Sequence, residues 1–184
     1  VHASKKKSAH WKNKLGEHKQ WRVGIVWGGN PEHKNDHNRS CRLSDFSKLA
    51  TIPGIKWYSI QKGNPESQAL VPPVGMDLTI LSGDIRDFAD TAAIIDNLDL
   101  VISVDTSVVH LAGAMGKPAW VLLAFNPDWR WLLDRGDSPW YPSLKLFRQK
   151  RFGDWDSAFE QVYESLTELV KERFGPGFNE PPVL

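Results

Sequence analysis

The residues best suited to chemistry in this chain follow one short apolar run. Residues 101–104 resemble a buried strand that ends in Asp105, Thr106 and Ser107, where a helix pattern begins. The backbone N–H groups at the start of a helix have no partner inside it, so they attract an anion. His110 lies four residues beyond Thr106 and therefore on the same face, about one turn further along. These residue types in this order suit a ligand whose phosphate groups are joined to a polar ribose.

A glycine-rich turn after the predicted strand at residues 22–27 is a second candidate. Its glycines let a ligand approach the backbone, and the polar side chains after them add hydrogen-bond donors. The residues are Gly28, Gly29, Asn30, Lys34, Arg39 and Ser40. Their spacing is neither the dinucleotide-binding fingerprint nor a P-loop. His33 and His37 are four residues apart, but no third clear ligand accompanies them, so we predict no metal site.

Three further turns carry polar side chains next to predicted strands or helices. The residues are Gln61 and Lys62, Asp84 and Asp87, and Asp128 and Arg130. Each has a structural alternative: a lysine after a strand is usually solvated, an aspartate at a helix start is usually a cap, and residues 125–142 could pack as a lid. The same alternatives apply to Asp105 as a cap and to His110 as a half-buried side chain. Because several strand ends carry donors of the phosphate-binding type, we favour a binding site.

The elements that must position these turns alternate between strand and helix patterns. Strands are predicted at residues 22–27, 55–61, 78–81, 100–104, 119–123 and 144–148, and helices at 8–20, 43–52, 87–98, 107–115 and 154–174. Strands rich in Val and Ile that alternate with helices predict an α/β fold, a parallel sheet with helices on both faces. Ligands of such sheets bind beyond the carboxyl ends of the strands, where the candidate turns lie.

Composition narrows the class of protein. The 184 residues are 41% hydrophobic and 24% charged, as in a folded domain, and no apolar run approaches the roughly 20 residues of a membrane helix. A single cysteine, Cys41, and the lack of a secretory signal pattern predict a cytoplasmic location.

The positive charge is concentrated near the start of the chain, where residues 1–42 hold ten of the 23 lysines and arginines. We interpret them as a solvated arm and, after Trp27, as a positive field beside an anion site. Without a DNA- or RNA-binding module, we expect no nucleic-acid partner.

The nine tryptophans are many for a chain of this size. Most of them are expected in the core or in packing between domains, because an indole offers a large apolar area and one N–H. For one or two of them, a stacking platform for a base or a sugar is the alternative.

Three segments resemble a known family. DTSVVHLAGAMGKP at residues 105–118 is similar to the D-T-x-x-x-H-L-A-x-A-x-G-x-P stretch of glycosyltransferase family 9, the heptosyltransferase-like enzymes. DWRWLLDRGDSPWYPSLKLFRQ and VWGGNPEHKNDHNRS resemble the branch of that family found behind tetratricopeptide repeats in bacterial proteins. Ser107 departs from the heptosyltransferase pattern, which usually has glycine there, and this puts heptose as the transferred sugar in doubt.

The resemblance implies the B-type glycosyltransferase fold, in which two Rossmann-like domains face a cleft. The chain is similar to the C-terminal half of that fold, the domain that binds the nucleotide-sugar. It implies a linker helix from a missing N-terminal domain at residues 1–20, a Rossmann-like nucleotide-sugar-binding domain at 21–175 and a tail at 176–184. In that arrangement Trp11 and some tryptophans of residues 125–142 would be exposed.

The resemblance also assigns roles to the turns. Donor phosphates would contact Gly28, Gly29, Asn30, Arg39, Lys62, Thr106 and Ser107. The nucleoside and sugar would contact Gln61, Asp84, Asp87, Asp105, His110, Asp128 and Arg130. Cations and a helix terminus would take the place of a metal, so no metal or other cofactor is expected.

We therefore expect a glycosyltransferase donor domain that transfers no sugar in isolation. The acceptor and the catalytic base would belong to a separate N-terminal domain, with tetratricopeptide repeats as a further partner. The alternative is a non-catalytic nucleotide- or sugar-binding or scaffold module of a repeat-containing protein. The sugar, the nucleotide, the acceptor and the oligomeric state stay open.

Overall fold

Six parallel strands form the single sheet of the computed structural model, which describes residues 1–17 and 19–175. The strands are β1 (Trp21–Val26), β2 (Ile55–Ser59), β3 (Leu78–Ile80), β4 (Leu100–Val104), β5 (Ala119–Leu123) and β6 (Leu144–Arg148). Their order is β3-β2-β1-β4-β5-β6, and every neighbouring pair is parallel. This Rossmann-like α/β arrangement confirms the predicted fold class. The predicted tail at 176–184 lies outside the described residues.

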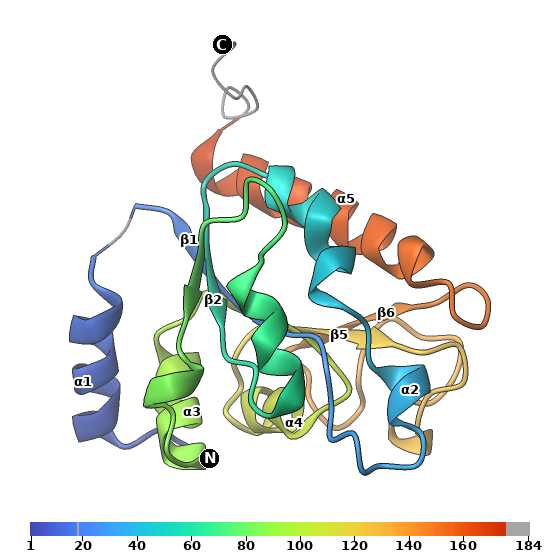
Figure 1. The fold of residues 1–184 in the computed structure, drawn as a ribbon, viewed down its shortest axis with the longest axis horizontal. Helices are drawn as coiled ribbons and strands as arrows, with labels where there is room; N and C mark the ends of the chain where they lie inside the picture. The colour runs from blue at the N-terminus through green and yellow to red at the C-terminus, as the bar shows by residue number, and fades with distance from the viewer. Residues whose placement is uncertain (18, 176–184) are drawn as a thin grey trace.

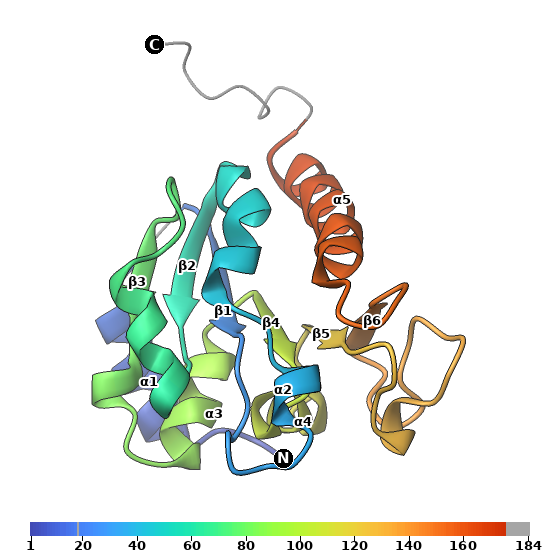
Figure 2. The ribbon, with the colours of Figure 1, turned by 45° about the vertical axis from the view of Figure 1, so that its right-hand side comes forward.

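Helices cover both faces of the sheet (Figure 1). They are α1 (Lys5–Leu15), α2 (Asp36–Arg39), α3 (Phe88–Asp96), α4 (Ser107–Ala114) and α5 (Trp155–Phe174). Four 3₁₀ helices join them: η1 (Leu43–Thr51), η2 (Asn64–Leu70), η3 (Ser82–Asp84) and η4 (Trp129–Trp131). Figure 2 shows α5 and α1 on opposite sides of the sheet, which makes the three layers of the fold visible.

Each face of the sheet has its own hydrophobic core. All residues of β4 and β5 are buried, as expected for strands covered on both sides. On one face η1 and α5 pack through Phe46 and Phe159, whose rings meet edge to face 4.8 Å apart. On the other face α1, α3 and α4 pack against the sheet around residues such as Ile94 and Val109. Packing on both faces holds the strands in place and thereby positions the turns that follow their carboxyl ends.

Helix α1 is packed more tightly than a linker helix was expected to be. Trp11, predicted to be exposed, is 2% exposed and lies in the core with α3. Its indole N–H donates to Asp90 at 3.4 Å, and the Lys7 ammonium contacts Asp90 at 2.7 Å and Asp87 at 2.9 Å. These bonds from Lys7 lower the pKa values of both aspartates, and they raise the pKa of Lys7 itself. The expectation for Trp11 was wrong because α3 supplies the apolar partner that the α1 sequence cannot reveal.

Several boundaries differ slightly from the predictions. Helix α1 spans residues 5–15 rather than 8–20, and it ends at Gly16 with a φ of 72° that favours glycine. Helices α3 and α5 begin one residue later than predicted because Asp87 and Asp154 are their N-caps. Residues 43–51 form a 3₁₀ rather than an α-helix. Within the described residues, no helix combines the length and the apolar character that a membrane crossing requires.

Candidate functional site

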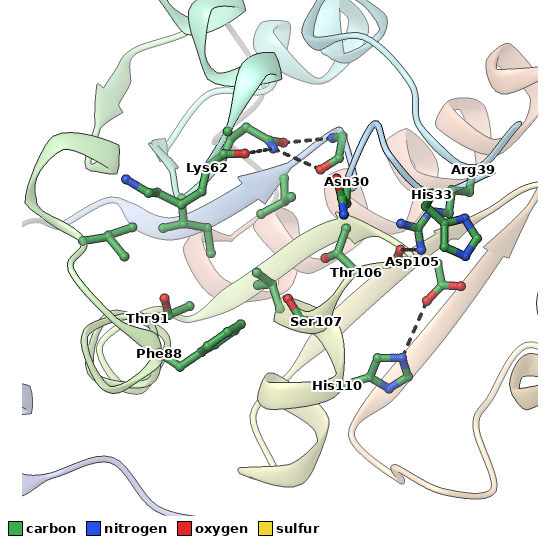
Figure 3. A pocket seen from close by; sticks show the side chains of 18 of the residues that line it. Asn30, His33, Arg39, Lys62, Phe88, Thr91, Asp105, Thr106, Ser107 and His110 are labelled. Atoms are coloured by element: carbon green, nitrogen blue, oxygen red, sulfur yellow. Dashed lines mark hydrogen bonds and ion pairs between the residues drawn. The ribbon is translucent and has the colours of Figure 1, made fainter. Parts of the chain in front are cut away.

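A cavity of about 840 Å³ lies at the carboxyl ends of β1 to β5 (Figure 3). Its walls come from the turns after these five strands, and it spans the point between β1 and β4 where the strand order changes direction. This switch point is where open parallel sheets bind their ligands. Of the residues assigned to the donor phosphates, nucleoside and sugar, all but Asp84 line this cavity: Gly28, Gly29, Asn30, Arg39, Gln61, Lys62, Asp87, Asp105, Thr106, Ser107, His110, Asp128 and Arg130. Lys34 and Ser40, which were also named in the glycine-rich turn, do not line it.

The start of α4 faces the cavity without a side-chain cap. Thr106 is its N-cap residue, but its side chain accepts no hydrogen bond from the first turn. In α3 and α5, by contrast, Asp87 and Asp154 each accept a backbone N–H. The first-turn N–H groups of α4 at Ser107 and Val108 belong to residues of the cavity wall. An anion in the cavity could therefore accept bonds that a cap makes elsewhere.

The Thr106 hydroxyl is already engaged with a neighbouring side chain. Its oxygen lies 3.0 Å from the Ser103 hydroxyl, which in turn donates to the Val104 carbonyl at 2.7 Å. Because the Ser103 proton points to that carbonyl, the Thr106 hydroxyl is the donor of the pair. To donate to a ligand, as predicted from the sequence, Thr106 must rotate its hydroxyl away from Ser103.

Arg39 connects the turn after β1 to the turn after β4. Its guanidinium donates to the Asp105 carbonyl at 3.3 Å (Figure 3). It also donates to the Asp36 carboxylate at 3.2 Å. Gly29 lies directly against this guanidinium, since a Cβ there would come within 2.7 Å of Arg39 Nη2. The glycine is therefore required for close packing of the turn against Arg39. The arginine is held at the cavity wall before any ligand arrives.

Gln61 acts as an internal brace for the glycine turn. Its side chain is 2% exposed, and its Oε1 accepts the backbone N–H groups of Trp27 and Gly28 at 3.0 and 2.9 Å. Its Nε2 donates to the carbonyls of Gly28 and Lys62 at 3.0 and 2.8 Å. These bonds use both ends of the amide, so Gln61 fixes the backbone beneath the cavity. Its predicted role as a ligand contact stays a prediction.

Lys62 provides positive charge on the opposite wall from α4. Its ammonium donates to the Ser82 carbonyl at 2.7 Å, and no carboxylate of the described residues lies within ion-pair distance of it. The neighbouring wall includes Arg86, Phe88 and Thr91, which were not predicted from the sequence. Phe88 and Thr91 come from the start of α3 and face the same space (Figure 3). In the sequence, Arg86, Phe88 and Thr91 stand out only because they lie close to the candidate residues Asp84 and Asp87.

His110 is held from several sides. Its Nε2 lies 3.6 Å from Asp105 Oδ1, as Figure 3 shows, and its Nδ1 lies 3.3 Å from the Tyr141 hydroxyl. The ring also stacks on Trp131, with centroids 5.2 Å apart. The imidazole is therefore oriented by its neighbours while one side lines the cavity. The packing fits the structural alternative of a half-buried histidine, and the contact of His110 with a ligand stays a prediction.

The remaining aspartates behave differently from one another. Asp84 lies outside the cavity wall and pairs with Lys14 of α1 at 2.7 Å, so its position does not support the predicted ligand contact. Asp128 does line the cavity and accepts two bonds from Arg130, at 3.0 Å from the backbone N–H and 2.7 Å from the guanidinium. Partial burial acts to raise the pKa of Asp128, but these bonds outweigh it and lower that pKa. Asp128 and Arg130 therefore form a charge-compensated pair.

No metal centre is evident in the part of the chain that the structure describes, where no group of three or more His, Cys, Asp or Glu side chains could hold an ion. His33 lines the cavity and accepts a bond from the Asn35 N–H through its Nδ1 at 3.2 Å. His37 belongs to α2 and is not part of the wall. The two histidines therefore do not line the cavity together.

Comparisons with known proteins match a family model over part of the chain and one curated relative over most of it. Residues 65–131 match the family model of glycosyltransferase family 9 (heptosyltransferase). Protein FlbA of Caulobacter vibrioides is 28% identical over 178 residues, which covers 88% of this chain and 28% of FlbA. This chain therefore spans less than a third of that curated relative.

Solved structures show the same fold at low identity. E. coli ADP-heptose lps heptosyltransferase II superposes with a TM-score of 0.67 at 13% identity, covering 94% of this chain and 53% of the enzyme. The family 9 glycosyltransferase of Veillonella parvula gives the same TM-score and coverage at 12% identity. E. coli heptosyltransferase WaaC with ADP has a TM-score of 0.56 at 14% identity, covering 84% of this chain and 45% of WaaC. The fold is thus the Rossmann-like fold of B-type glycosyltransferases, and the chain corresponds to about half of such an enzyme.

Proposed function

We propose that this domain binds a nucleoside-diphosphate sugar as the donor half of a metal-independent glycosyltransferase. The observation that carries the proposal is the uncapped start of α4, which opens into a cavity at the switch point of the sheet. The Lys62 ammonium, which donates to the Ser82 carbonyl, adds a positive charge on the opposite wall of the same cavity. Together they offer backbone N–H groups and a cation to one anionic ligand.

The family model and the fold support this assignment. The matched residues 65–131 include the start of α4 and the turn after β3, which are two walls of the cavity. WaaC, which shares the fold, was solved with ADP. We propose that the ligand of this chain is of the same chemical class, a nucleoside diphosphate that carries a sugar, with the nucleotide and the sugar left open.

The proposed reaction places a negative charge where the donor groups lie. The bond between the anomeric carbon and the diphosphate oxygen breaks, and the electron pair leaves with the nucleoside diphosphate. Lys62, Arg39 and the N–H groups at the start of α4 would stabilise that leaving group. The acceptor hydroxyl forms the new bond at the anomeric carbon and loses its proton to a base. We place that base, and the acceptor, on a separate N-terminal domain, with tetratricopeptide repeats and a cytoplasmic setting as further parts of the proposal.

Calorimetry with UDP, GDP and ADP tests the binding half of the proposal. We expect at least one of them to bind, with equal affinity in EDTA and in Mg²⁺, because fixed cations and a helix terminus replace the metal. Lys62→Met should weaken that binding, whereas Lys150→Met, an exposed lysine outside the cavity wall, should not. A strict requirement for Mg²⁺, or equal effects of the two variants, would contradict the proposal.

A transfer assay tests the catalytic half. This chain alone should bind the donor and transfer no sugar, whereas the full-length protein should transfer it. Turnover by residues 1–184 would place the base within this chain. A full-length protein that binds donor without turnover would instead favour the alternative of a non-catalytic binding or scaffold module.

A further inference from the structure

A second cavity, of about 600 Å³, adjoins the candidate site. Its walls are His110, Trp129, Arg130, Trp131, Trp140 and Tyr141. His110 and Arg130 line both cavities, so the second cavity shares a wall with the first. All of its residues except His110 belong to the segment between β5 and β6, which the first cavity uses only through Asp128 and Arg130. The proposed function gives this aromatic cavity no role.

Two tryptophans of the aromatic cavity expose large apolar rings. Trp129 is 68% exposed and Trp140 is 56% exposed, although indoles of this size are usually well covered. Their rings meet edge to face at 86°, with centroids 6.4 Å apart, and so form two walls of a corner. Trp131 is completely buried beside them. The corner is fixed by a bond from the indole N–H of Trp140 to the Arg130 carbonyl at 2.9 Å.

The backbone that carries these rings is held in place. Arg148 of β6 donates from its guanidinium to the carbonyls of Trp131 at 2.6 Å and Arg135 at 3.1 Å. Leu132 and Asp134 have φ values of 54° and 57°, in the left-handed region that residues with side chains seldom adopt. Such conformations persist where the surrounding structure enforces them, and they concentrate at ligand-binding segments. The aromatic corner is therefore preorganised rather than dependent on a ligand for its shape.

The charges around the aromatic cavity favour an uncharged ligand. The Arg130 guanidinium is neutralised by Asp128 at 2.7 Å and lies 4.9 Å from the centroid of the Trp129 ring. The guanidinium would repel a cationic ligand. It would attract an anionic ligand only weakly, because Asp128 already compensates the charge of the guanidinium. The polar groups that remain are the Tyr141 hydroxyl, the Arg130 guanidinium and the imidazole of His110. They suit a ligand with several hydroxyl groups.

The shape of the corner selects among uncharged rings. A flat base stacks best between parallel faces, whereas Trp129 and Trp140 stand perpendicular to each other. A puckered sugar ring presents C–H groups to an indole face and hydroxyl groups at its rim. We infer that the aromatic cavity binds a carbohydrate ring beside the nucleotide-binding cavity. Its place next to a diphosphate rests on the proposed function, and the ring belongs either to the donor sugar or to a saccharide acceptor.

Calorimetric titrations of the chain and of the variants Trp129→Ala and Trp140→Ala test the inference. Phe152→Ala is the matched control, because Phe152 is 69% exposed and lies outside both cavity walls. The ligands are a nucleoside diphosphate, the corresponding nucleotide-sugars, and free oligosaccharides with the nucleotide at saturation. Circular dichroism checks that each variant keeps its fold.

The expected result is a selective loss. The tryptophan variants should bind the nucleotide-sugar about tenfold more weakly while binding the bare diphosphate as the parent does, which identifies the donor sugar as the occupant. A similar loss confined to the free oligosaccharide identifies an acceptor. Unchanged affinity for every saccharide, or an equal loss for the bare diphosphate, would overturn the inference. If the parent binds no nucleotide, the proposed function fails, and saccharide binding lost in the variants still supports the carbohydrate site.

Discussion

Replacing Gln61 by leucine should strongly lower the free energy of unfolding, because Gln61 supports the glycine turn beneath the cavity. Leucine has nearly the same volume but no polar atoms, so the backbone around the glycine turn loses its brace. The N–H groups of Trp27 and Gly28, both buried, would keep no acceptor in the positions they now have. The carbonyl of Gly28 would lose its donor as well.

The size of the effect follows from these lost bonds. A buried N–H left without an acceptor costs about 1–3 kcal/mol, so two of them predict a loss of about 2–6 kcal/mol in the free energy of unfolding. Domains of this kind are stable by only about 5–15 kcal/mol, so the loss is large. Because Gly28 lines the cavity, the affinity for nucleotide should fall together with stability.

Urea unfolding followed by circular dichroism measures the free energy directly. The control is Gln68→Leu. The exposed Gln68 accepts a single bond, from the Leu43 N–H to its Oε1, and losing it should cost about 1 kcal/mol. If Gln61→Leu unfolds within about 0.5 kcal/mol of the parent, the usual range of a neutral surface change, the brace does not exist. A changed slope of free energy against urea would indicate a different unfolded state rather than a lost brace.

Three further changes probe other contacts. Thr106→Val should weaken nucleotide binding by about 1.5–3 kcal/mol in calorimetry, because the bond it loses would be made to a charged group. It should lower the free energy of unfolding by about 1 kcal/mol, because it also loses the bond to Ser103. Gly113→Ala should lower the melting temperature, since its Cβ would come within 2.5 Å of the Tyr141 ring. Lys7→Met should destabilise the protein at neutral pH, and the difference from the parent should shrink as the pH falls below 3.8, the ordinary pKa of Asp90. The lowered pKa of that carboxylate stabilises the folded state above this value, and the stabilisation disappears as the carboxylate is protonated.

Each of these changes has a control and a result that would contradict it. Ser103→Ala removes the partner of the threonine hydroxyl but no cavity group, so its affinity should stay near that of the parent. If Thr106→Val binds the nucleotide as tightly as the parent does, the Thr106 hydroxyl has only a structural role. The alanine variant at 113 should also change the environment of His110, and an unchanged histidine NMR signal would contradict the proposed ring packing. Lys12 lies in the same helix and forms no ion pair with the described residues, so Lys12→Met is the control, and a matching pH profile for it would refute the role of Lys7.

The elements with a continuous local pattern could be predicted from the sequence. The strands at 100–104, 119–123 and 144–148 were predicted with the observed bounds, because each is a short apolar run between turn residues. The position of the site followed from the parallel sheet, since the carboxyl ends of parallel strands share one edge. That single inference brought most of the predicted residues to one cavity.

The remaining features depend on contacts between distant segments. Trp11 is buried only because α3 lies against α1, and nothing in residues 1–20 reveals that partner. Asp84 and Arg86 are two residues apart, yet the 3₁₀ turn η3 directs Asp84 to Lys14 and leaves Arg86 on the cavity wall. The bond of Thr106 to Ser103 likewise depends on how β4 meets α4.

The strand order gives the two ends of the candidate site separate origins. Strands β1 to β3 and β4 to β6 occupy opposite halves of the sheet, and the cavity lies across the seam between them. One half supplies Lys62 and Phe88, and the other supplies Trp129 and Trp140. A mutation on the Lys62 side or on the Trp129 side can therefore change the ligand contacts of that side alone. The start of α4, which lies between the two sides, stays unchanged. With the nucleotide and carbohydrate sites proposed above, evolution could therefore change one specificity of the domain while keeping the other.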